Sequence, residues 1–89
     1  EYHLGDINVA LKKTDTNIYT GVAELQAGSY KFNLNNNGTT HGFNYTYTDT
    51  ANINYSAGYK AQTTLIATGG RYTFTYDTST KTLKIKYKN

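Results

Sequence analysis

The chain has 89 residues, with nine lysine or arginine and six aspartate or glutamate side chains, so its formal net charge at pH 7 is +3. It contains ten tyrosines but no cysteine, proline, methionine or tryptophan. This length predicts one domain over residues 1–89. The composition excludes a disulfide scaffold, a thiolate metal site and a cysteine nucleophile, and no apolar run approaches the ~20 residues of a membrane-spanning helix.

Apolar and polar residues alternate along most of the chain, and this period of two is typical of half-buried β-strands. In chain order, the alternation predicts strands over residues 7–12, 18–25, 30–34, 43–48, 62–67, 72–76 and 83–87. Residues 15–17, 68–70 and 77–81 read as turns, and the polar run 35–42 reads as a loop. The turns at 15–17 and 77–81 predict two hairpins, which join the strands on either side of each turn. Residues 49–59 are undecided, with room for a short strand at Ile53 and Tyr55.

Seven or eight short strands separated by turns are typical of a β-sandwich. We therefore expect an all-β fold, an antiparallel immunoglobulin-like β-sandwich; an up-and-down barrel is the alternative. A Gly-X-Tyr-X-Phe pattern occurs at residues 28–32 and again at 70–74. The aromatic residues of these strands are expected to fill the core: Tyr30, Phe32, Tyr72, Phe74 and Tyr76.

The sequence offers little for catalysis. The acidic residues are scattered through turns and strand ends, whereas glycoside hydrolysis needs a carboxylate pair. His3 and His41 lie far apart, and no nucleophile-elbow or phosphate-loop motif occurs. His3 and Asp6 supply only two ligands, fewer than a zinc site needs. We expect no enzymatic activity, no metal and no cofactor.

Four tyrosines gather between residues 43 and 59, a segment without lysine or arginine. An exposed tyrosine ring stacks on the C–H face of a sugar, while asparagine and glutamine amides bind sugar hydroxyls. The predicted stacking residues are Tyr45, Tyr47, Tyr55 and Tyr59. The predicted hydroxyl partners are Asn36, Asn37, Asn54, Lys60 and Gln62. The alternative for each tyrosine is a place in the core.

Lysines instead cluster near the end of the sequence, at Lys81, Lys84, Lys86 and Lys88. On a terminal strand these lysines would protect an exposed sheet edge against aggregation. Because the tyrosine-rich segment has no cation to neutralise phosphates, it favours an uncharged polysaccharide over a nucleic acid.

Two segments resemble the bacterial starch-binding immunoglobulin-like domains of pullulanases and surface starch-utilisation proteins. They are Ala-Gly-Ser-Tyr-Lys-Phe-Asn-Leu-Asn-Asn-Asn at residues 27–37, and Gly-Arg-Tyr-Thr-Phe-Thr-Tyr-Asp at 70–77 followed by Lys-Thr-Leu-Lys-Ile at 81–85. The resemblance, over residues 22–87, implies binding of starch or a related α-glucan by a secreted or cell-surface module of a larger bacterial protein. The family commonly places a tryptophan after the Asn-rich strand, where this chain has residues 38–40, Gly-Thr-Thr. A tyrosine would have to take its role, and a structural or adhesive module is the alternative function.

Overall fold

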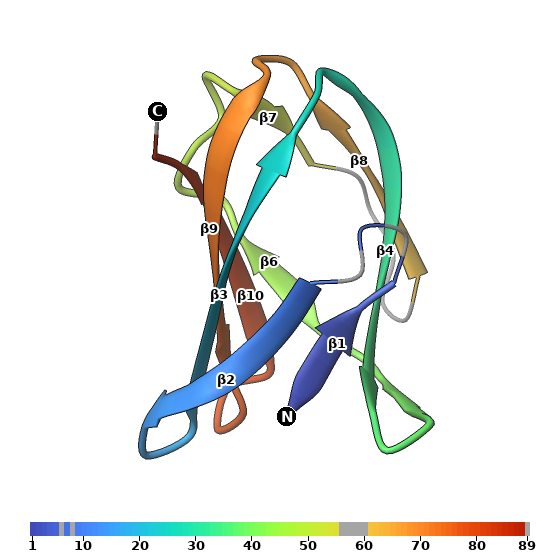
Figure 1. Cartoon of the computed structure of the whole chain (residues 1–89), viewed down its shortest axis with the longest axis vertical. Helices are drawn as coiled ribbons and strands as arrows, with labels where there is room; N and C mark the ends of the chain where they lie inside the picture. Colours follow the sequence, from blue (N-terminus) through green and yellow to red (C-terminus); the bar gives the residue numbers. More distant parts are fainter. Residues whose placement is uncertain (6, 8, 56–60, 89) are drawn as a thin grey trace.

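The computed structural model describes residues 1–5, 7, 9–55 and 61–88, which are all-β and contain no helix (Figure 1). The all-β prediction is therefore confirmed. The strands are β1 (Tyr2–Leu4), β2 (Val9–Asp15), β3 (Ile18–Leu25), β4 (Gly28–Asn36), β5 (Thr39–His41), β6 (Asn44–Thr46), β7 (Ile53–Asn54), β8 (Ala61–Ile66), β9 (Gly70–Asp77) and β10 (Thr82–Tyr87).

The strands form one continuous sheet in the order β6-β10-β9-β3-β2-β1-β4-β8-β7, with β5 beside β4. The sheet is mixed, and not purely antiparallel as expected, because β6 runs parallel to β10. It curls until β4 and β8 lie across from β9 and β10 (Figure 1). The two predicted hairpins, β2–β3 and β9–β10, are both present.

The sheet changes direction at β2. The first part of β2, Val9–Leu11, pairs with β1, whereas Lys12 and the residues after it pair with β3. Strand β1 pairs on its other side with β4. Strands β1 and β2 therefore join the two halves of the curled sheet.

The polar run 35–42 is not a loop, as the sequence suggested, but a hairpin between β4 and β5. Asn37 and Gly38 form its turn with φ angles of 53° and 81°, conformations that asparagine and glycine tolerate. Asn35 accepts a hydrogen bond from Thr40 Oγ1 at 3.0 Å and donates one to Asn33 Oδ1 at 2.8 Å. These side-chain bonds let a polar segment continue a strand.

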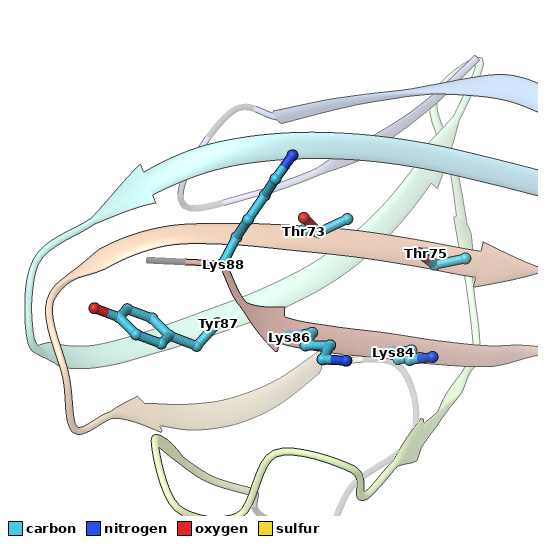
Figure 2. Close-up of a pocket in the computed structure, with 6 residues that line it drawn as sticks. All are labelled: Thr73, Thr75, Lys84, Lys86, Tyr87 and Lys88. Atoms are coloured by element: carbon cyan, nitrogen blue, oxygen red, sulfur yellow. The ribbon is translucent and has the colours of Figure 1, made fainter.

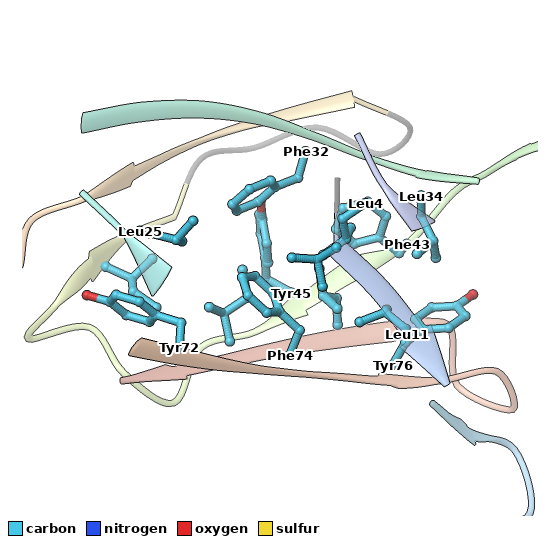
Figure 3. Packing of buried hydrophobic residues seen from close by; sticks show 14 of the residues in the cluster. Leu4, Leu11, Leu25, Phe32, Leu34, Phe43, Tyr45, Tyr72, Phe74 and Tyr76 are labelled. Atoms are coloured by element: carbon cyan, nitrogen blue, oxygen red, sulfur yellow. The ribbon is translucent and has the colours of Figure 1, made fainter. Parts of the chain in front are cut away.

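The core lies between the two halves of the sheet (Figure 3). Phe32 of β4 meets Phe74 of β9 edge to face, with ring centroids 5.9 Å apart. Tyr72 and Tyr76 are also buried, as the alternation predicts. Tyr30 is half-buried against this core, and its hydroxyl donates to the carbonyl of Gln26 at 2.7 Å. None of the described segments forms a helix long and apolar enough to cross a membrane.

Candidate functional site

Three of the four candidate tyrosines form one cluster around β6 and the segment that follows it. The ring of Tyr55 lies 4.9 Å from Tyr45 and 4.9 Å from Tyr47, between ring centroids. Tyr45 also contacts Phe43 edge to face at 5.5 Å, which connects the cluster to the core.

Tyr45 is not available for stacking on a ligand, which corrects the prediction from the sequence. Only 6% of its surface is exposed, because it lies opposite Leu83 on the inward face of β6. Its hydroxyl shares a hydrogen bond with Thr64 Oγ1 across the core. Burial, opposed by this bond, raises the pKa of Tyr45 to about 12.

Replacing Tyr45 with phenylalanine is expected to lower the free energy of unfolding by about 1–3 kcal/mol, because the fully buried Thr64 hydroxyl loses its partner. Urea unfolding measures this loss. Adding Thr64→Val to Tyr45→Phe removes the orphaned hydroxyl and should restore part of the stability. A double variant less stable than Tyr45→Phe alone would contradict the assignment.

Tyr55 also stabilises the sheet. Strand β6 ends at Thr46, so among the described strands none pairs with this edge of β10 beyond Lys84. The Tyr55 hydroxyl donates to the carbonyl of Ile85 at 3.1 Å, and Asp49 Oδ2 accepts from the Tyr87 amide at 2.5 Å. The segment after β6 thus satisfies the open edge of β10 with side chains. Burial is the largest cause that raises the pKa of Tyr55 to about 12.

Tyr47 remains accessible. Its side chain is 61% exposed, and its ring stands at 87° to that of Tyr55. Because Tyr55 is itself anchored to β10, the exposed ring has a fixed support.

The described part of the chain does not bring Asn54 together with Asn36 and Asn37. Asn36 and exposed Asn37 belong to the β4–β5 hairpin, at the end of the molecule away from β7 (Figure 1). Exposed Asn54 lies in β7 opposite Leu65 of β8, which pairs with Ser29 near the start of β4. Ser29 is up to ~23 Å along β4 from Asn36. Gln62 pairs with Phe32 in the β4–β8 ladder. Tyr59 and Lys60, like Asp6, lie outside the described residues.

The structure also has a hollow that the sequence did not predict. A hollow of about 420 Å³ lies on the outer face of β9 and β10 (Figure 2), lined by Thr73, Thr75, Lys84, Lys86, Tyr87 and Lys88. The sequence predicts that these lysines protect an exposed sheet edge against aggregation, but β10 lies between β9 and β6. Comparing the outward positions of both strands of the predicted 72–87 hairpin would have placed these lysines beside the threonines.

The described residues bring no three histidine, cysteine, aspartate or glutamate side chains together as metal ligands. His3 Nε2 lies 3.4 Å from Glu1 Oε1, with both side chains about half exposed. Comparison of the chain with family models, curated proteins and solved structures gave no match.

Proposed function

We propose that this domain is a non-catalytic carbohydrate-binding module for starch or a related α-glucan, with Tyr47 as its stacking ring. The observation that carries the proposal is the exposure of Tyr47, at 61%, on a supported aromatic cluster. A tyrosine ring offers contact area at small entropic cost and a hydroxyl that still forms hydrogen bonds.

The sequence segment that contains Tyr47 also supports an uncharged ligand, because it holds no lysine or arginine. Between residues 43 and 59 the only ionisable group other than the tyrosines is the carboxylate of Asp49. This carboxylate accepts hydrogen bonds from the Tyr87 amide and, at 2.9 Å, from Asn52 Nδ2. A phosphate-bearing ligand would find no cation in this segment. A sugar, which binds by C–H contact and hydroxyl hydrogen bonds, needs none.

The resemblance to starch-binding domains extends the proposal to fold and location. Its two quoted segments fall on β4 and on the β9–β10 hairpin, which lie on opposite sides of the core. We therefore propose that the curled sheet is a variant of the immunoglobulin-like sandwich of that family. The same reasoning makes the domain a secreted or cell-surface module of a larger bacterial protein.

Affinity electrophoresis in soluble starch tests the function. The wild-type domain should be retarded, with a Kd on the order of 10⁻⁴ M for a single site. Tyr47→Ala should weaken retention about tenfold, the loss expected for one aromatic contact, whereas Tyr47→Phe should retain most of it. Val22→Ala is the matched control, because Val22 is 50% exposed on the outer face of β3.

Retention of a neutral glucan should change little with salt, whereas binding of a nucleic acid should collapse. An unretarded wild-type domain with silent calorimetry would remove the proposal. Equal retention of wild type and Tyr47→Ala would remove Tyr47 from the site.

A structural or adhesive module is the second candidate. The burial of Tyr45 and the anchoring of Tyr55 to β10 favour it, because both tyrosines are explained without a ligand. This function predicts that no glycan changes the tyrosine fluorescence.

A further inference from the structure

The outer face of the β3–β9–β10 part of the sheet has a regular arrangement of side chains. The inward positions of β9 and β10 hold aromatic and aliphatic core residues, so alternate residues face outward. Cross-strand pairing places these outward residues in four rows: Glu24–Arg71–Lys88, Val22–Thr73–Lys86, Thr20–Thr75–Lys84 and Ile18–Asp77–Thr82. In the last row, Asp77 Oδ1 accepts hydrogen bonds from the backbone and the hydroxyl of Ser79. Lysine ammonium groups therefore border a column of threonine hydroxyls.

The charge on this face is unbalanced. Glu24 lies 3.4 Å from Arg71 and offsets that guanidinium. Within the described part of the chain, Lys84, Lys86 and Lys88 have no ion-pair partner. Figure 2 shows the Lys88 side chain lying across β9 near Thr73, with Lys84 and Lys86 farther along the hollow.

Edge protection does not explain these lysines. Strand β10 is paired with β9 along its length and with β6 at Lys84. Its remaining edge is occupied by Tyr55 and Asp49. Three lysines without an ion-pair partner among the described residues thus need another explanation, and charge complementarity points to an anionic ligand.

We propose that the hollow on β9 and β10 binds an acidic polysaccharide that carries carboxylate groups. Lys84, Lys86 and Lys88 contact the carboxylates, and the hydroxyls of Thr73 and Thr75 bind the sugar hydroxyls between them. Alternate residues on a strand are ~6.6 Å apart, so the three lysines present a repeating charge to a polymer with repeating charge. This site is separate from Tyr47, which does not line the hollow.

The same hollow is a poor site for single-stranded nucleic acid, which needs an aromatic platform for its bases. Among the described residues that line it, Tyr87 alone is aromatic. Its ring packs against Tyr72, with centroids 5.3 Å apart, and lies so close to Gly70 that an added Cβ there would meet Tyr87 Cε1 at 2.6 Å. The ring is therefore occupied by contacts within the domain.

The test uses polygalacturonate as the probe and its fully methyl-esterified, uncharged form as the matched ligand control. The wild-type domain should bind polygalacturonate at about 20 mM salt, lose most of this binding at about 300 mM salt, and ignore the ester. Lys84→Gln with Lys86→Gln should weaken binding about tenfold, from two lost charge contacts.

Lys13→Gln with Lys31→Gln is the matched variant. It removes the same charge from exposed positions of β2 and β4 that lie outside the rows on this face, and should change binding less than about twofold. Circular dichroism of both variants tests whether they are folded. Binding to soluble starch, measured in parallel, should be unchanged by either pair, so failure here and failure of the Tyr47 site are distinguished.

Several results would overturn the proposal. Equal weakening by both lysine pairs would show a response to net charge alone. Tighter binding of single-stranded poly(dT) than of polygalacturonate would assign the face to nucleic acid. Binding to neither polymer at low salt would leave the lysines as a solvated surface.

Discussion

Replacing Gly21 with alanine is expected to lower the free energy of unfolding by about 3 kcal/mol, at the upper end of what overpacking costs. A Cβ at Gly21 would lie 2.6 Å from the carbonyl oxygen of Ala10 and 2.8 Å from Leu11 Cδ2. The first contact is with backbone, which cannot rotate away. It falls where β2 leaves β3 to pair with β1, so the backbone of β2 or β3 must shift at the junction between the two halves of the sheet.

Gly69→Ala is the matched control for Gly21→Ala. A Cβ at Gly69 would approach no atom outside its neighbours closer than 3.5 Å, an ordinary contact, and should change stability by less than about 0.5 kcal/mol. Urea unfolding of both variants at pH 7 gives the comparison. Equal stability of the two variants would show that β2 does not need the close approach at Gly21.

Raising the pH from 10 to 12 is expected to unfold the domain progressively. Burial raises the pKa values of Tyr45 and Tyr55 to about 12, whereas an unfolded tyrosine titrates near 10. In this window the unfolded chain has lost protons that the folded chain keeps, so the free energy of unfolding falls as the pH rises. The stability is fully present below pH 10. Between pH 10 and pH 12, Tyr45 alone is expected to account for about 2 kcal/mol of the loss.

Urea unfolding between pH 8 and pH 12, with phenolate absorbance as a second signal, measures this dependence. Tyr55→Phe removes one of the two groups, so its stability should fall less steeply than that of wild type between pH 10 and pH 12. Adding Tyr45→Phe with Thr64→Val should flatten the curve further. Parallel curves for all three proteins would show that these tyrosines do not control alkaline unfolding.

The burial of Tyr45 and the exposure of Tyr47 show the limit of a local pattern. Both residues alternate with threonine and asparagine and have the same inward parity. Tyr45 lies within β6 and is held inward by its pairing with Leu83. Tyr47 follows the end of that strand, beyond the last described pair of β6 with β10, and it is exposed.

The lysines of β10 also show that a local pattern does not predict which strands lie side by side in the sheet. Alternation correctly places Lys84 and Lys86 on the outside, because it depends only on neighbouring residues. Whether a strand lies at an edge depends on what pairs with it, and here the partner is β6, far away in sequence and parallel. A terminal strand therefore reads as an edge in the sequence although it is interior in the sheet.

Period-two alternation and turn residues were enough to predict the all-β class, the two long hairpins and the aromatic core residues. The order of strands in the curled sheet, the use of Tyr55 and Asp49 on the open edge of β10, and the exposure of the Tyr47 ring depend on the three-dimensional arrangement. Alternation assigns a residue only to one face of its own strand. Pairing between distant strands then decides whether that face meets the core, another strand or solvent.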